Sequence, residues 1–282
     1  MADPDPWLEA EYNNRAKVPG HPDIMRGWER DAAAFRAAHP HAEPALPYGD
    51  GPRQALDLFW PDGRRDVPIA LFVHGGYWQA LDRSWFSHLA RGFVARGVAL
   101  ALPSYDLCPR VSLAALVEQV RGAAAFLVRR HGRAVLAGGH SAGGHLAAML
   151  LATDWTARGL PPGAVHAAYA ISGLFDLSPL LSTTINAALG LDVETARRLS
   201  PLWLPPPGRP FYAAVGDAEG EEYLRQTRAI AAAWGGTWDV LPGADHFTAI
   251  APLADPSSPL LSAILGMMPA HGRPDLPRPA RA

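Results

Sequence analysis

The sequence predicts an α/β fold in which a mainly parallel sheet is covered by helices on both faces. Three short runs, at 69–73, 98–102 and 211–216, are apolar throughout, as expected of strands that are buried on both faces. A segment with the apolar periodicity of a helix, 112–130, lies between two such runs. Strands that alternate with helices indicate parallel pairing, and the functional site of such a sheet lies beyond the carboxyl ends of its strands.

The other elements follow in order along the chain. We expect further strands at 54–60, 134–138, 167–172 and 238–241, and further helices at 23–38, 145–151, 221–234 and 247–267. No linker or internal repeat divides the chain, so the sequence predicts a single domain over 1–271. Its N-terminal segment, 1–48, is expected to pack over the sheet or the entrance of the site. The tail, 272–282, is rich in proline and arginine, which predicts disorder.

Composition limits the kinds of function that this chain can have. Its 282 residues are 49% hydrophobic and 18% charged, which is enough apolar material for a large core. The formal net charge is −2 and the basic residues are scattered, so no strong field attracts nucleic acid or an anionic membrane. The expected partner is a small-molecule substrate, and the sequence leaves a homodimer open.

The single cysteine and the first residues of the chain indicate in which cellular compartment the protein is expected. Cys108 has no second cysteine to pair with, which suits a reducing cytosol. The first residues are acidic and lack the apolar core of a signal peptide. No apolar run approaches the ~18 residues that a membrane-spanning helix requires. We therefore expect a cytoplasmic protein.

The most informative stretch is Gly-Gly-His-Ser-Ala-Gly-Gly at 138–144, which separates an apolar run from an apolar-periodic run. This order indicates a strand, a tight turn and a helix, with Ser141 at the turn. Glycines at 139 and 143 allow the chain to bend sharply and allow strand and helix to approach closely. The Ser141 hydroxyl would project above the sheet as a candidate nucleophile. The alternative is that Ser141 only caps the helix.

A nucleophilic serine needs a base, and the base needs an acid that orients it. His246 follows the last predicted strand, where an α/β-hydrolase places its histidine. The acid is expected on the loop after the strand at 211–216. We favour Glu219, with Asp217 as the second candidate and Asp176, after the strand at 167–172, as the third.

Attack on a carbonyl carbon also requires donors for the oxyanion that forms. The backbone N–H of Ala142, directly after the serine, is one candidate. The N–H groups of Gly75 and Gly76 are the others, because they follow the strand at 69–73, where an oxyanion loop belongs. Five aromatic residues are expected near the mouth of the site, either as a surface for an aryl ring or as core: Tyr77, Trp78, Trp85, Phe86 and Tyr105.

Several motifs together resemble the kynurenine formamidases (arylformamidases). H-G-G-Y-W at 74–78 is similar to the H-G-G-x-W of that family, and it departs from the H-G-G-G of hormone-sensitive-lipase-like esterases. Other matching stretches are L-E-A-E-Y-N at 8–13, S-Y-D-L-C-P at 104–109, I-S-G-L-F-D-L at 171–177 and E-Y-L-R-Q at 222–226. The resemblance covers nearly the whole chain except the tail.

The resemblance implies an α/β-hydrolase fold and a triad of serine, acid and histidine that works without metal or cofactor. Animal members of the family place Asp where Glu219 stands. The implied reaction is hydrolysis of an N-formyl aryl amine, such as N-formylkynurenine, to formate and the free amine. Two alternatives stay open: a carboxylesterase or amidase for another small acyl group, and a noncatalytic ligand-binding protein of the same fold.

Overall fold

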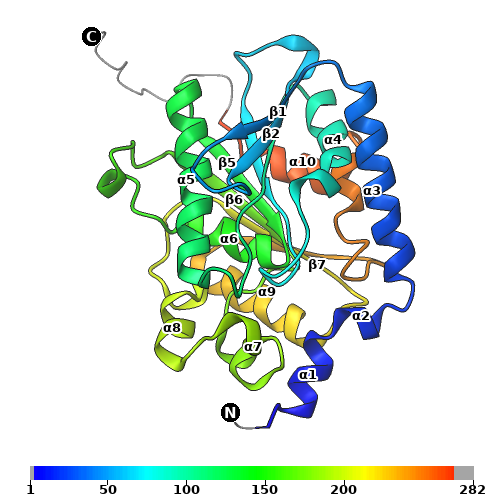
Figure 1. Cartoon of the computed structure of the whole chain (residues 1–282), viewed down its shortest axis with the longest axis vertical. Coiled ribbons are helices and arrows are strands. Elements are labelled where there is room, and N and C mark those ends of the chain that lie inside the picture. Colours follow the sequence, from blue (N-terminus) through cyan, green and yellow to red (C-terminus); the bar gives the residue numbers. More distant parts are fainter. Residues whose placement is uncertain (1–2, 270–282) are drawn as a thin grey trace.

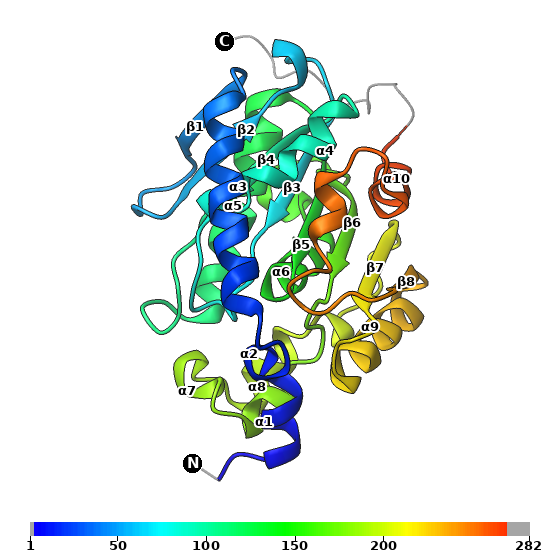
Figure 2. The ribbon, with the colours of Figure 1, turned by 90° about the vertical axis from the view of Figure 1, so that its right-hand side faces the viewer.

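The computed structural model describes residues 3–269, and the tail predicted to be disordered, 272–282, lies outside the described residues. Eight strands form one sheet in the order β1-β2-β4-β3-β5-β6-β7-β8 (Figures 1 and 2). Strands β3 to β8 run parallel, while β2 pairs antiparallel with both β1 and β4. The strands are β1 (Ala42–Pro47), β2 (Ala55–Phe59), β3 (Ile69–Val73), β4 (Ala99–Pro103), β5 (Val135–His140), β6 (Val165–Ile171), β7 (Phe211–Gly216) and β8 (Thr237–Leu241). This mainly parallel sheet confirms the predicted fold class.

Helices cover both faces of the sheet. The α-helices are α1 (Pro6–Tyr12), α2 (Asn14–Lys17), α3 (His21–Ala38), α4 (Ala90–Ala95), α5 (Leu113–His131), α6 (Ala142–Leu151), α7 (Asn186–Leu189), α8 (Val193–Arg198), α9 (Glu221–Trp234) and α10 (Pro259–Leu265). Side chains of β3 alternate between the two layers. Leu71 belongs to the buried cluster that includes residues of α5, α6 and α9, whereas Phe72 belongs to the cluster that includes residues of α3, α4 and α10.

The predicted helix over 247–267 is wrong. The chain instead makes turns, a short 3-10 helix at Ala251–Ala254 and then α10. Prolines explain the break, because each lacks an N–H and cannot sit inside a helix. Pro252 and Pro256 lie in the interrupted stretch, and Pro259 opens α10 after Ser258, whose side chain caps that helix.

The N-terminal segment contains elements that the sequence pattern did not predict. Besides α3, it forms α1, α2 and the edge strand β1. Figure 2 shows α1 and α2 beyond the end of the sheet where the loops after β5 and β7 gather, beside α7, α8 and α9. The backbone N–H of Asp5 donates to the carbonyl of Ser182, which ties the start of α1 to the loop before α7. Within residues 3–269, none of the helices combines the length and the apolar character that crossing a bilayer would require.

Candidate functional site

Ser141 lies on the tight turn between β5 and α6. Its backbone adopts φ 56° and ψ −122°, a strained conformation for a residue with a side chain. The turn depends on its glycines. A Cβ on Gly143 would lie 1.9 Å from the carbonyl oxygen of Val73, and one on Gly139 would lie 2.2 Å from the carbonyl oxygen of Gly143. The Ser141 side chain does not cap α6, although the residue occupies the N-cap position. Its hydroxyl is thus directed away from the helix amides.

The Ser141 hydroxyl meets His246, which comes from the loop after β8. The Oγ of Ser141 lies 3.1 Å from Nε2 of His246, and Nδ1 of His246 lies 2.6 Å from Oε2 of Glu219. Because a carboxylate accepts, Nδ1 carries the proton, and Nε2 is left as an acceptor for the serine hydroxyl. The side chains of His246 and Glu219 are 7% and 0% exposed. The two hydrogen bonds therefore form a continuous chain that is shielded from solvent.

Glu219 is held in place by two further donors. The backbone N–H of Gly216 donates to its Oε1 at 2.8 Å, and the Ser172 hydroxyl donates to the same oxygen. The other two candidate acids lie elsewhere. Asp217 is exposed and accepts from the backbone N–H of Gly243. Asp176 accepts from the N–H of Ser178. Of the three candidates, Glu219 is the one that contacts the histidine.

The loop after β3 runs alongside Ser141. A Cβ on Gly75 would lie 3.0 Å from the Cβ of Ser141 and 2.9 Å from the carbonyl oxygen of His140. Gly76 has φ +103°, which favours glycine, and a Cβ there would lie 2.5 Å from the carbonyl oxygen of Ala80. Within residues 3–269, the amides of Gly75, Gly76 and Ala142 donate no hydrogen bond. These three amides are therefore available to an oxygen atom beside Ser141.

Buried aromatic rings hold this loop in position. The His74 ring is stacked on Tyr105 at 4.3 Å, and the Tyr105 hydroxyl donates to the His74 carbonyl. Burial lowers the pKa of His74 to about 4, so its ring is neutral at pH 7. Trp78 is fully buried with its ring 5.1 Å from that of His145, and Phe86 is also core. The loop is thus held on its buried side by the side chains of Trp78, Phe86 and Tyr105.

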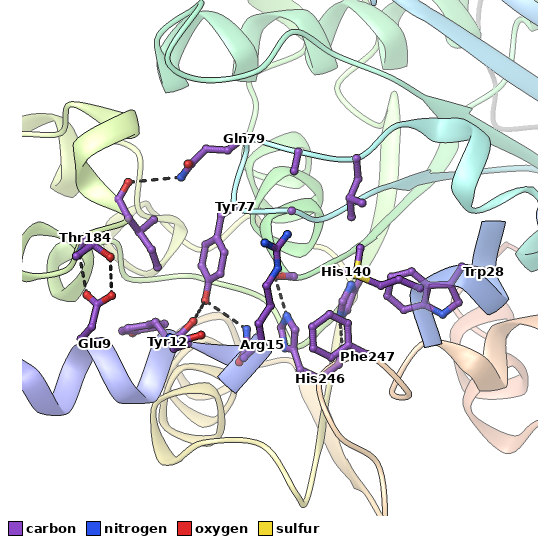
Figure 3. A pocket seen from close by; sticks show the side chains of 18 residues that line it. Glu9, Tyr12, Arg15, Trp28, Tyr77, Gln79, His140, Thr184, His246 and Phe247 are labelled. Atoms are coloured by element: carbon purple, nitrogen blue, oxygen red, sulfur yellow. Dashed lines mark hydrogen bonds between the residues drawn. The ribbon is translucent and has the colours of Figure 1, made fainter. Parts of the chain in front are cut away.

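A cavity of about 470 Å³ opens above Ser141, a size that suits a small organic molecule. Aromatic side chains wall one end, where the rings of Trp28 and Phe247 lie 6.0 Å apart (Figure 3). Glu9 and Thr184 lie at the other end. Ser141 and His246 therefore lie between an aromatic end and a polar end.

Residues of the N-terminal segment complete the cavity, and sequence patterns did not single them out. Asn14, on α2, donates to the Tyr223 hydroxyl at 2.7 Å. The Tyr223 and Tyr77 hydroxyls lie 2.6 Å apart, and Tyr77 donates to the carbonyl of Tyr12 at 2.6 Å. Tyr223 in turn lies beside His246, with ring centroids 4.7 Å apart. A buried hydrogen-bond network thus connects the N-terminal segment to both the loop after β3 and α9.

A second part of this network holds α1 against α9. The Tyr12 hydroxyl donates to Oε2 of Glu222 at 2.6 Å and accepts from Nε2 of Gln226 at 2.7 Å. Both partners lie in E-Y-L-R-Q, and Tyr12 lies in L-E-A-E-Y-N. Those two matching stretches were the sequence signal that could have predicted this contact.

His140 is a further titratable group beside the serine. Its Nε2 donates to the carbonyl of His246 at 2.8 Å, and the two rings lie 4.7 Å apart. Burial, together with the neighbouring His246, lowers the pKa of His140 well below its ordinary value. His140 is thus a neutral support for the backbone of His246.

The arrangement can perform acyl transfer: a hydroxyl faces a histidine that a carboxylate orients, and free amides lie beside it. Within the described part of the chain, no group of three or more His, Cys, Asp or Glu side chains is placed to hold a metal ion.

Comparisons with known proteins agree with this geometry. The BD-FAE family model matches residues 56–161. The kynurenine formamidase of Salmo salar is 34% identical over 238 residues, which cover 79% of this chain and 81% of that protein. The kynurenine formamidase of Danio rerio is 31% identical, with 79% and 80% covered. A crystal structure of a candidate thioesterase from Silicibacter sp. TM1040 is 36% identical, has a TM-score of 0.85, and covers 91% of this chain and 98% of its own. The chain therefore has the α/β-hydrolase fold and belongs to the kynurenine formamidase family.

Proposed function

We propose that the protein hydrolyses N-formyl aryl amines, such as N-formylkynurenine, to formate and the free amine. The observation that carries the proposal is the hydrogen-bonded chain from Ser141 through His246 to Glu219, which lies beneath a partly aromatic cavity. The named activity of the Salmo salar and Danio rerio relatives supports this substrate class.

In the first half of the proposed reaction, the Ser141 oxygen attacks the formyl carbon. Nε2 of His246 accepts the hydroxyl proton, and Glu219 stabilises the imidazolium that forms. The amides of Gly75, Gly76 and Ala142 bind the negative charge on the former carbonyl oxygen. When the C–N bond breaks, His246 gives its proton to the leaving nitrogen, and the formyl group remains on Ser141.

In the second half, a water molecule attacks the formyl ester. His246 accepts a proton from that water and returns it to the Ser141 oxygen as the ester bond breaks, and formate leaves. Both halves use the same residues, so a single site serves the whole reaction.

Replacement of the serine tests this mechanism. Ser141→Ala is expected to lower kcat for N-formylkynurenine by about 10⁴-fold or more, because the groups of a triad act as a unit. A fluorophosphonate probe should label the wild type at Ser141, which mass spectrometry of the labelled peptide would show. Near-native turnover by folded Ser141→Ala, or a label at another residue, would overturn the assignment.

Ester or thioester hydrolysis is a second candidate function. The specific observation in its favour is the 36% identical structure from Silicibacter sp. TM1040, which is described as a candidate thioesterase. The same groups can cleave such substrates. The ratio of kcat/KM between N-formylkynurenine and short p-nitrophenyl or thiol esters separates the two functions. A large advantage for the esters would favour the second candidate and contradict the formamidase proposal.

A further inference from the structure

Two fully charged side chains line the cavity over Ser141: Glu9 and Arg15. They differ in their surroundings. The Glu9 carboxylate accepts hydrogen bonds from the backbone N–H and the hydroxyl of Thr184. Within residues 3–269, the Arg15 guanidinium makes no hydrogen bond or ion pair and is exposed. The cavity therefore offers one positive charge whose hydrogen-bonding capacity is free for a ligand.

The position of Arg15 is fixed by its neighbours. It belongs to α2, whose first residue, Asn14, is buried and bonded to the Tyr223 and Tyr77 hydroxyls. The preceding residue, Asn13, caps α2 by accepting from the N–H of Ala16. Figure 3 shows the Arg15 side chain extending from α2 into the cavity between Tyr77 and His140. A buried anchor thus holds the base of this side chain beside the reacting centre.

We propose that Arg15 is a specificity-determining residue that binds the carboxylate of an N-formyl aryl amine carrying an amino-acid side chain. This inference rests on the proposed function and adds the recognition of the substrate's charge. A guanidinium presents paired donors that match a carboxylate bidentately. Trp28 and Phe247 wall the aromatic end of the cavity, and Arg15 extends into its centre, so one ligand can pack an aryl ring on the two aromatic side chains and present a carboxylate to the guanidinium.

The test compares two substrates that differ in one group: N-formylkynurenine and its α-carboxamide, which keeps the ring, the formamide and the ammonium but lacks the negative charge. For the wild type, kcat/KM should be about 10- to 100-fold higher with the carboxylate, the range for a charge-assisted hydrogen-bonded pair. Arg15→Gln should remove most of this preference, chiefly through KM. Its kcat/KM for the carboxamide should stay within about threefold of the wild type.

Two further variants serve as controls. Arg15→Lys keeps the charge but not the paired donors, so it should restore part of the preference. Arg64→Gln alters an exposed arginine that follows the 3-10 helix at Pro61–Gly63, away from the cavity, and should leave the preference unchanged. Thermal melting of each variant checks that the fold is intact.

Each outcome decides the inference. Loss of the preference in Arg15→Gln, with the carboxamide still hydrolysed, supports it. Two outcomes would overturn the role of Arg15 but leave the proposed function intact. In the first, the wild type hydrolyses both substrates equally well. In the second, Arg15→Gln loses activity towards both substrates to the same extent. A wild type that hydrolyses neither substrate overturns the proposed function, and this inference with it.

Discussion

Glu219 and Asp217 are only two residues apart, yet their side chains have different environments. Glu219 lies against His246, with its Oε1 bonded to the N–H of Gly216, whereas Asp217 faces solvent and the N–H of Gly243. Sequence patterns predict an acid on the loop after β7 and favour Glu219, but they leave Asp217 as an alternative. Which of the two acids faces His246 depends on the conformation of the loop. Hydrogen bonds from Ser172 and Gly216 to the Glu219 carboxylate set this conformation.

Substitution of the two acids tests the arrangement. Glu219→Gln keeps the size of the side chain but removes the charge that stabilises the imidazolium and holds the tautomer of His246. We expect kcat for N-formylkynurenine to fall by about 10³- to 10⁴-fold. Asp217→Asn is the matched control, and its kcat should stay within about threefold of the wild type, because Asp217 does not contact His246. Steady-state kinetics would contradict this assignment if the Asp217 variant were the inactive one.

At the scale of the elements, the buried strands and long helices were predictable from the sequence. The runs at 69–73 and 211–216 coincide with β3 and β7, and the predicted helix at 221–234 coincides with α9. Continuous apolar runs and long amphipathic repeats determine these elements locally. The apolar residues between 247 and 267 have similar spacing, but prolines divide that stretch into turns and α10.

The elements that were not predicted depend on contacts with the rest of the molecule. Strand β1 contains two prolines, has no buried residue and has an irregular register with β2, so no periodic pattern marks it. Helices α1 and α2 have seven and four residues, too few to be stable alone. Buried hydrogen bonds from Tyr12 and Asn14 to α9 hold them in place.

Removal of the Asn14 side chain tests how far the cavity depends on α2. Asn14→Ala leaves the Tyr77 and Tyr223 hydroxyls without their amide donor. We expect the free energy of unfolding to fall by about 1–3 kcal/mol. KM should rise more than kcat falls, because α2 forms the wall of the cavity and Asn14 does not touch the reacting atoms.

The matched control for this prediction is Asn13→Ser, on the neighbouring residue. Serine keeps an oxygen that can accept from Ala16 and cap α2, and within residues 3–269 Asn13 makes no hydrogen bond to either tyrosine hydroxyl. Denaturant unfolding and steady-state kinetics should show little change for this control. Equal stability and equal KM in Asn14→Ala and Asn13→Ser would mean that the network does not shape the site.

At the scale of the whole molecule, the site joins segments that are far apart in the sequence. Ser141, Glu219 and His246 lie on loops that follow β5, β7 and β8, so the topology of a parallel sheet brings them to one edge. That juxtaposition was predictable from the order of strands and helices. The sequence also predicts that the N-terminal segment packs over the sheet or the entrance of the site, but no pattern singles out Tyr12, Arg15 and Trp28 as the residues that line the cavity, because the path of this segment is not a property of the sheet.

The whole molecule also contains several histidines that are held neutral by burial. His166, on β6, is one of them: neither ring nitrogen has a hydrogen-bond partner within residues 3–269, and burial lowers its pKa to about 4. The unfolded chain, with an ordinary histidine pKa of about 6.5, binds protons more readily than the folded chain. The free energy of unfolding therefore has its full value, as far as His166 is concerned, above pH 6.5. It decreases progressively as the pH falls from 6.5 towards 4, because protons then bind the unfolded chain first.

His166→Leu removes this titrating group without removing a hydrogen bond. We expect the wild type to lose stability between pH 7.5 and pH 5.5, and the variant to lose about 1 kcal/mol less over the same interval. Urea unfolding of both proteins at the two pH values measures the difference. Each protein is compared with itself at pH 7.5, so any contribution of altered packing to the free energy of unfolding cancels in the difference between the two pH values. An identical loss in both proteins would mean that His166 is protonated in the folded state, or that local opening exposes it to water without global unfolding.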